Sequence, residues 1–310
     1  MKTIIENEKL NKNNKPLFFY KFVPFERKDI LKKGMIKFTL AKDFNDPFEL
    51  IPTITPYSLD WIEYYGNLSD DERKNTKFND SDYSYSIERL NTLTMNKNLL
   101  NEKINQIGIL SLSSNYNINQ FLTVSMPEKS DPRTNLIMWS HYADSHKGFI
   151  IEFREDFIKN INIQKVEYND VRDILTYEDI DNNNFNKLFL KKSLEWSYEQ
   201  EYRAILKLND ADEIINQNVH LFKFDKSKIN SITLGCNMSE ENKNIITDLI
   251  QNDSEYKNVG FNHAYLNEEG YYLNFYSDDG NITNRLECDG EVLGIRDIPM
   301  QKHLLNANKT

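Results

Sequence analysis

Two acidic residues stand two positions apart in the aromatic segment Trp196-Ser-Tyr-Glu-Gln-Glu-Tyr-Arg203. Side chains two positions apart on a β-strand point to the same face of the sheet. If this segment is a strand, Glu199 and Glu201 form an anionic wall framed by aromatic rings. Such a wall can transfer protons or stabilise a cationic transition state. The alternative is a solvated edge strand whose surface salt bridges contribute little to stability.

Arg203 lies two positions after Glu201 and therefore continues the same spacing. On a regular strand its side chain points to the same face as Glu201, where a guanidinium can keep the carboxylate ionised or contact a phosphate. A purely structural ion pair between Arg203 and Glu201 is the alternative.

A second polar cluster lies in the segment Ala41-Lys-Asp-Phe-Asn-Asp-Pro-Phe-Glu49. Asn45 and Asp46 are strong turn formers, and Pro47 favours an extended conformation for the residue before it. The flanking phenylalanines can anchor such a turn in the core. The turn therefore either satisfies its own backbone or presents Asn45 and Asp46 to a ligand.

The third cluster is Met138-Trp-Ser-His-Tyr-Ala143, which continues to Gly148. Trp139 or Tyr142 could stack on a nucleobase or nicotinamide while His141 bonds a ribose hydroxyl. His141 and His146 are five positions apart, which is not a helical metal-binding spacing. A histidine that is hydrogen-bonded at a helix end is the alternative for both.

The apolar pattern predicts the elements that position these clusters. Leu17-Phe-Phe-Tyr-Lys-Phe22 is almost all aromatic, as in a strand. A short helix begins at Pro24 and ends at Gly34, a residue type that favours a left-handed C-terminal stop. Residues 35–40 alternate like a half-buried strand. Further strands are predicted at 107–113, 148–153, 202–208, 221–225, 229–234, 263–266 and 271–275, and helices at 136–143 and 239–251.

This irregular succession of strands and helices predicts an α+β fold with a mixed or antiparallel central β-sheet surrounded by helices. We expect a single domain over residues 17–275, with a mainly helical insertion at about 56–105. The polar residues 1–16 are expected to form a flexible lead-in. Residues 276–310 form a C-terminal extension rich in Asp, Gly and Asn.

Composition narrows the classes of function. The 38 basic and 48 acidic residues give a net charge of −10, which argues against unspecific binding of a nucleic-acid backbone as the main activity. Cys236 and Cys288 are too few for a disulfide framework or a cysteine-based zinc site. Since no run approaches the roughly 20 apolar residues of a membrane span, we predict a cytoplasmic protein without membrane contact.

Several familiar catalytic motifs are missing from the sequence. It contains no phosphate-binding loop that ends in Gly-Lys-Ser/Thr and no Gly-x-Gly-x-x-Gly after a strand. It also contains no Gly-x-Ser-x-Gly elbow and no His-Glu-x-x-His. An ordinary kinase, Rossmann dehydrogenase, serine hydrolase or zinc protease is therefore not expected.

Taken together, the polar clusters resemble the bacterial domain-of-unknown-function family 2971. The resemblance runs from about residue 17 to about residue 275. The residues that carry it are Tyr20-Lys21, Phe44-Asn-Asp-Pro-Phe-Glu49, Met138-Trp-Ser-His-Tyr-Ala143, His146-Lys-Gly148 and Glu199-x-Glu-Tyr-Arg203. The family name carries no activity.

A second resemblance is to ADP-ribosyltransferase folds, which also open with a strand, a short helix, a glycine and a second strand. Those enzymes bind NAD at a split β-sheet and carry a late Glu-x-Glu or Gln-x-Glu. Ser111-Leu-Ser-Ser114 is similar to the Ser-Thr-Ser element of their arginine-modifying branch. This sequence departs from them at the first strand, where Tyr20-Lys21 stands in place of an arginine or a His-Gly pair.

The second resemblance implies that NAD is the substrate. No metal is expected, because the sequence offers no clear set of Asp, Glu and His ligands. Glu201 would stabilise the oxocarbenium-like transition state of nicotinamide–ribose cleavage, and Glu199 would act as the general base towards the acceptor. The residues expected to bind the nucleotide are Tyr20, Lys21, Asn45, Asp46, Ser111, Ser113, Trp139, His141, Tyr142 and Arg203.

Three functions stay open at this point. The first is transfer of ADP-ribose from NAD to a protein or nucleic acid, or hydrolysis of NAD, with a role in phage defence or as a toxin by analogy with bacterial accessory proteins of this size. The second is a non-catalytic module that recognises a nucleotide or a partner protein. The third is a metal-dependent hydrolase or nuclease, for which the sequence offers no clear ligand set.

Overall fold

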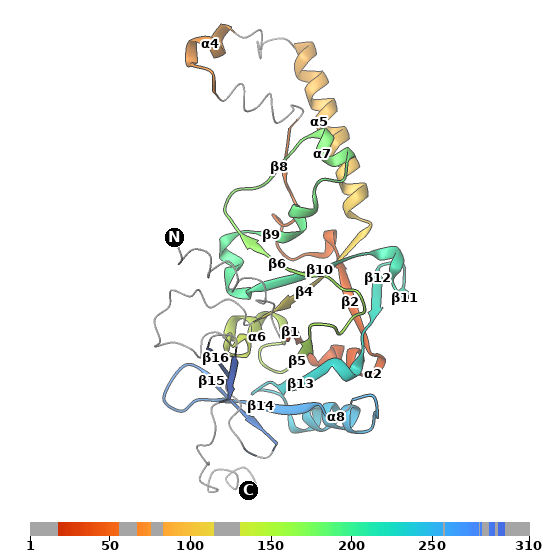
Figure 1. Ribbon diagram of the computed structural model, residues 1–310, viewed down its shortest axis with the longest axis vertical. Coiled ribbons are helices and arrows are strands. Elements are labelled where there is room, and N and C mark those ends of the chain that lie inside the picture. Colours follow the sequence, from red (N-terminus) through yellow and green to blue (C-terminus); the bar gives the residue numbers. More distant parts are fainter. Residues whose placement is uncertain are drawn as a thin grey trace, which may run out of the picture.

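The computed structural model describes residues 18–55, 67–75, 83–114, 131–256, 258–278, 280, 285–288 and 291–294. The fold is α+β, as the sequence predicts, with a mixed and largely antiparallel central sheet (Figure 1). The predicted lead-in at residues 1–16 lies outside the described residues.

The described residues place eleven strands in the central sheet. All pairs are antiparallel except β13 with β14. The order is β11-β12-β2-β4-β1-β5-β13-β14-β15, and β10 joins β4 to β6 off this path. The bounds are β1 Phe18–Val23, β2 Met35–Leu40, β4 Ile107–Ser113, β5 Phe149–Arg154, β6 Ile163–Lys165, β10 Glu201–Lys207, β11 Glu213–Ile215, β12 Val219–Lys223, β13 Ile229–Leu234, β14 Gly260–Leu266 and β15 Leu273–Ser277.

Shorter strands pair outside this sheet, and α-helices and 3₁₀ helices lie between the strands along the chain. The pairs are β3 (Thr53–Ile54) with β8 (Ile174–Leu175), β7 (Glu167–Tyr168) with β9 (Lys191–Lys192), and β16 (Arg285–Cys288) with β17 (Glu291–Gly294). The α-helices are α2 Asp29–Lys33, α4 Asp70–Asn75, α5 Tyr83–Ile104, α6 Leu136–Tyr142, α7 Tyr177–Asp181 and α8 Glu240–Gln251. The 3₁₀ helices are η1 Phe25–Arg27, η2 Ala41–Asp43, η4 Pro132–Thr134, η5 Asn186–Leu190, η6 Leu194–Glu199, η7 Leu208–Asp210 and η8 Lys226–Lys228.

The helices α4 and α5 correspond to the predicted helical insertion, and α5 extends away from the central sheet (Figure 1). Residues 56–66 and 76–82 of that insertion lie outside the described residues. Within the described ranges, no helix has the length and apolar character of a membrane span.

The central sheet divides at β4. One edge of β4 pairs with β10 along its whole length. Its other edge is shared, because Ile109 pairs with Thr39 of β2 whereas Ser113 pairs with Tyr20 of β1. Ser111 lies between these two pairings, so β1 and β2 diverge on either side of it.

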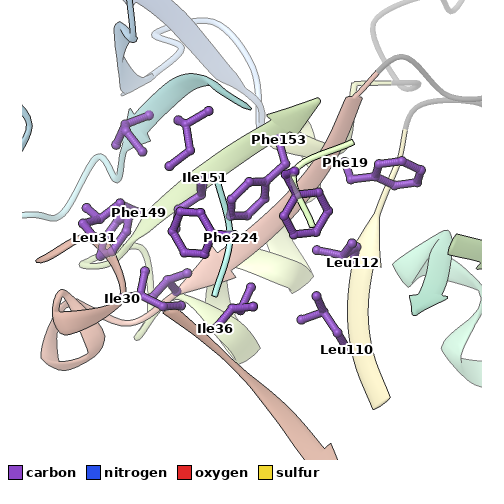
Figure 2. Close-up of a cluster of buried hydrophobic side chains, with 14 of the residues drawn as sticks. Phe19, Ile30, Leu31, Ile36, Leu110, Leu112, Phe149, Ile151, Phe153 and Phe224 are labelled. Carbon is purple, nitrogen blue, oxygen red and sulfur yellow. The ribbon is translucent and has the colours of Figure 1, made fainter. Parts of the chain in front are cut away.

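One face of the sheet carries the largest apolar cluster (Figure 2). The central strand β5 is buried on both faces, which explains its nearly continuous apolar sequence. Every second side chain of β5 points into this cluster, and α2 and α8 add theirs. Its members include Phe19, Ile30, Leu31, Ile36, Leu110, Leu112, Phe149, Ile151, Phe153, Phe224, Ile246 and Ile250.

Helix α6 packs on β1 and forms a second apolar cluster. Trp139 lies at its centre and is fully buried, with its ring edge-to-face on Phe22 at 5.5 Å between centroids. The indole Nε1 donates a hydrogen bond to the carbonyl of Arg133 at 2.7 Å. The packing of this cluster fixes the position of α6 relative to β1.

Two predicted helix ends have the geometry that their residue types favour. Gly34 closes α2 in the left-handed region, at φ 65° and ψ 34°. Ser239 begins α8, and its hydroxyl accepts a hydrogen bond from the backbone of Asn242 at 3.3 Å.

Gly148 lies at a close approach of three backbone segments, between α6 and β5. A Cβ atom at this position would come within 2.2 Å of the Val23 carbonyl oxygen and 3.0 Å of the Ala143 backbone. Neither neighbour can rotate away as a side chain would. The glycine of the His-Lys-Gly motif is therefore required by packing.

Gly148→Ala is expected to destabilise the protein by about 1–3 kcal/mol, because the added methyl group overpacks a backbone contact. Gly260→Ala is the matched control, since a Cβ there meets its nearest atom at 3.7 Å. Chemical denaturation of both variants measures the difference. Equal stability of the two alanine variants would show that the close approach at Gly148 does not constrain the fold.

Candidate functional site

A cavity of about 430 Å³ opens where the sheet divides. That volume lies within the usual range of small-molecule sites, about 300–1,000 Å³. Its walls come from β1, β2, β4, α6, the loop after β2 and the η6–β10 junction. The lining residues are Tyr20, Lys21, Phe22, Thr39, Asp43, Phe44, Asn45, Ser111, Leu112, Ser113, Met138, His141, Tyr142, Lys192, Glu199 and Glu201.

The prediction that Glu199 and Glu201 share one face of a strand is wrong. Glu199 is the last residue of η6, and only Glu201 belongs to β10. Gln200 between them adopts the left-handed conformation, at φ 46° and ψ 49°. The chain therefore turns at Gln200, and strand alternation does not apply there.

The two carboxylates nevertheless converge, because Lys192 of β9 binds both. Its Nζ lies 2.6 Å from Glu199 Oε2 and 3.2 Å from Glu201 Oε2. Lys192 is buried, as are both acids. The two carboxylates therefore lie close together because both bind Lys192, and not because they share one face of a strand.

Arg203 and Glu49 complete this arrangement. Arg203 Nε donates to Glu201 Oε1 at 2.8 Å. Arg203 Nη2 donates to Glu201 Oε2 at 3.0 Å and also to Glu49 Oε1. Glu49 Oε2 is 3.7 Å from Lys192 Nζ. We call Glu49, Lys192, Glu199, Glu201 and Arg203 the ion cluster. Its three carboxylates and two cations give a net charge of −1 when all are ionised.

Burial shifts the protonation of the ion cluster. It raises the pKa of Glu201 to about 6, although the charge of Lys192 opposes this shift. Burial alone would lower the pKa of Lys192, but the charges of Glu201 and Glu199 outweigh it and raise that pKa above its usual value. At neutral pH, Glu201 is therefore mostly ionised and Lys192 is protonated.

Tyr142 connects Glu199 to the cavity. Its hydroxyl donates to Glu199 Oε1 at 2.5 Å and lies 3.5 Å from Asn45 Nδ2. Burial and the negative charge of Glu199 raise the pKa of Tyr142, so the phenol stays protonated. Asn135 caps the start of α6 and also donates to the Tyr198 carbonyl at 2.6 Å, which ties α6 to η6. That tie fixes Tyr142 relative to Glu199.

Lys21 fills the division of the sheet. Its Nζ donates to the carbonyl of Ser111 at 2.9 Å, at the point of β4 that neither β1 nor β2 pairs with. Burial lowers the pKa of Lys21 to about 8, against the opposing charges of Glu201 and Glu199. Lys21 is therefore a cation at neutral pH whose charge is lost under mildly alkaline conditions.

The structure brings three other predicted residues to the cavity wall. Tyr20 donates its hydroxyl to Glu152 Oε1 at 3.1 Å. Ser113 Oγ donates to the Glu199 carbonyl at 2.8 Å, which supports the η6–β10 junction. His141 is exposed, and its Nδ1 lies 3.2 Å from the Tyr198 hydroxyl.

Three other predicted residues do not line this cavity. Trp139 belongs to the core, so its ring cannot stack on a ligand. Asp46 accepts a hydrogen bond from the backbone of Phe48 and faces a neighbouring cavity of about 630 Å³. Arg203 is fully buried behind Glu201, in agreement with the structural ion pair that was the alternative in its case.

Sequence reasoning assigned no role to Lys192 or Glu49. Lys192 stands seven residues before Glu199, and this spacing alone does not predict a contact between the two side chains. The position of Lys192 is set by the pairing of β9 with β7. Glu49 ends the Phe44–Glu49 motif, and that motif was the one signal that pointed to it.

The groups of the cavity that could hold a nucleotide are cations and neutral hydrogen-bonding side chains. Lys21 offers a charge for a phosphate, and Asn45, Ser111 and His141 offer hydrogen bonds to ribose hydroxyls. In the part of the chain that the structure describes, no three His, Cys, Asp or Glu side chains form a metal-binding group.

Comparison with known proteins places one segment of the chain in a family. Residues 138–204 match the family described as "Protein of unknown function (DUF2971)". The match includes the Met138–Ala143 and Glu199–Arg203 motifs and confirms the family resemblance over this segment. The Tyr20-Lys21 and Phe44–Glu49 motifs lie outside the matched residues. No curated protein and no solved structure is significantly similar to the chain.

Lys192→Met is expected to destabilise the protein by about 3–5 kcal/mol at pH 7, because it leaves the three buried carboxylates of the ion cluster with Arg203 as the cluster's remaining cation. Without the opposing charge of Lys192, the already raised pKa of Glu201 rises further and Glu201 binds a proton on folding, so the loss is largest at neutral pH and shrinks towards pH 5. Denaturant unfolding at both pH values measures it.

The adjacent Lys191 provides the control. It pairs with Asp173 but its side chain is 23% exposed, against 3% for Lys192. Lys191→Met should change the free energy of unfolding by at most about 1 kcal/mol. A similar effect of both substitutions would mean that the ion cluster does not hold the site together.

Proposed function

We propose that this protein cleaves the nicotinamide–ribose bond of NAD and transfers the ADP-ribosyl group to an acceptor or to water. The family that matches residues 138–204 has no described activity, so the proposal is argued from the site. One observation carries the proposal. At the division of the sheet, a single cavity is lined by two buried carboxylates and by the ammonium group of Lys21.

The charge of the ion cluster suits this reaction. Breaking the bond between nicotinamide and ribose creates positive charge on the sugar ring. A fixed negative charge in a site that excludes water stabilises such a transition state strongly. The ion cluster supplies a net charge of −1, and ion pairs with Arg203 and Lys192 orient the Glu201 carboxylate.

Lys21 suits the opposite end of the substrate. The two phosphates of NAD are anionic, and a lysine ammonium is a common partner of a phosphate. Lys21 comes from β1, and the Ser111 carbonyl orients its ammonium group at the cavity. Asn45, Ser111 and Tyr142 line the same cavity as neutral groups for the ribose and nicotinamide.

Recognition of a nucleotide without catalysis is the second candidate. It is favoured by the pairing of Glu201, which already receives hydrogen bonds from Arg203 and Lys192. A role in phage defence or as a toxin is compatible with either function and rests on analogy alone.

The first test is loss of NAD in the presence of the purified full chain, measured as nicotinamide release. Glu201→Gln should lower the rate by about 10²–10³-fold, because it removes the stabilising charge. Glu195→Gln is the control, since Glu195 is exposed in the same η6 helix and its carboxylate accepts a hydrogen bond from the Ser193 hydroxyl. NAD that binds in a thermal-shift assay but is not consumed would favour the recognition module.

The pH dependence gives a second test. The kcat/KM for NAD should rise through about pH 6 as Glu201 ionises and fall through about pH 8 as Lys21 loses its proton. Lys21→Met should lower kcat/KM and abolish the alkaline limb while the acidic limb stays. An alkaline limb that persists in Lys21→Met would remove Lys21 from the phosphate-binding role.

A further inference from the structure

Both oxygens of the Glu199 carboxylate are occupied. Oε1 accepts the Tyr142 hydroxyl at 2.5 Å, and Oε2 accepts Lys192 Nζ at 2.6 Å. The side chain of Glu199 is 5% exposed. Each oxygen therefore already accepts a strong hydrogen bond, and its proton-accepting capacity towards an acceptor in the cavity is reduced, so we do not assign Glu199 as a general base acting alone.

Tyr142 is the group through which Glu199 meets the cavity. Its phenol is only half-buried and lines the cavity, and the Asn45 amide lies 3.5 Å from its oxygen. The phenol oxygen has two lone pairs, of which the Asn45 amide takes one in a long hydrogen bond, and the phenol proton points at Glu199. It can thus receive one proton as it passes on another.

The hydrogen bonds that Glu199 and Glu201 already accept disfavour a cationic acceptor. A guanidinium is recognised by a carboxylate that offers two free oxygens to its planar fork. Arg203 already takes that arrangement with Glu201, and Tyr142 and Lys192 block it at Glu199. Lys21 on the cavity wall adds a repelling charge. The remaining acceptor chemistry is a neutral O–H group.

We propose that the acceptor of this site is a neutral O–H group, either water or an alcohol, whose proton passes through the Tyr142 hydroxyl to Glu199. The inference rests on the proposed cleavage of NAD. It assigns Tyr142 as a catalytic residue that touches the acceptor, and Glu199 as the final proton acceptor behind it.

The step balances in atoms and charge. The bond from the anomeric carbon to nicotinamide breaks, and its electron pair goes to the pyridinium nitrogen, so neutral nicotinamide leaves. The acceptor oxygen bonds the anomeric carbon and gives its proton to the Tyr142 oxygen. Tyr142 gives its own proton to Glu199 Oε1, which becomes a neutral carboxylic acid.

The test supplies the full chain with NAD in four media: water alone, methanol, agmatine as a guanidinium probe, and azide. Mass spectrometry identifies the products. Wild type should form ADP-ribose and its methyl glycoside but no ADP-ribosyl agmatine. Azide brings no proton, so its attack needs no relay.

Tyr142→Phe should lower hydrolysis and methanolysis by about 10²–10⁴-fold, the usual contribution of a general base. Its azide product should fall far less. Glu199→Gln should show the same pattern, which keeps the test valid if one variant folds poorly. Tyr271→Phe, which removes a fully exposed phenol, should match wild type.

The outcomes separate the two claims. If wild type releases no nicotinamide with any of the four nucleophiles, the proposed function fails and this inference fails with it. If wild type is active but Tyr142→Phe hydrolyses NAD at the same rate, or loses the azide reaction equally, the relay is wrong while NAD cleavage stands. Preferred transfer to agmatine would overturn the acceptor class.

Discussion

The ion cluster is the constraint on which the rest of the site depends. Five ionisable side chains are buried together, and the loss of hydration is offset only if each charge keeps its partners. Their partners come from three separate stretches of chain: the loop after β2, strand β9 and the η6–β10 junction. The cluster therefore fixes the relative positions of segments that share few backbone hydrogen bonds. The cavity has its shape because these charges must meet.

The division of the sheet supplies the other half of the site. Where β1 and β2 separate on the edge of β4, the Ser111 carbonyl has no strand partner from either of them, and Lys21 binds it instead. Backbone carbonyls that are left unpaired in a protein interior are costly, so a donor is needed at this point. One side chain thus satisfies the sheet and places a cation in the cavity. Structure and proposed chemistry place the same requirement on Lys21.

Much of the fold could be predicted from the sequence. The strand at 107–113 and the helix that begins after Ser239 were predicted because apolar alternation and capping residues are local signals. The error at Glu199 has a physical cause, since nothing local shows that Gln200 adopts a left-handed conformation. Trp139 was misplaced because a helical tryptophan has the same pattern whether it faces the core or a ligand. Lys192 was missed because its partners are distant until the fold is complete.

The central claim is that the cavity at the sheet division holds the nicotinamide end of NAD against the ion cluster. A crystal structure of the full chain with a non-cleavable carbon-linked NAD analogue tests it most directly. The account predicts the nicotinamide ribose beside Ser111 and Glu201, with the Tyr142 hydroxyl facing the anomeric carbon and Lys21 at a phosphate. An analogue bound outside this cavity, or absent from it at saturating concentration, would contradict the account.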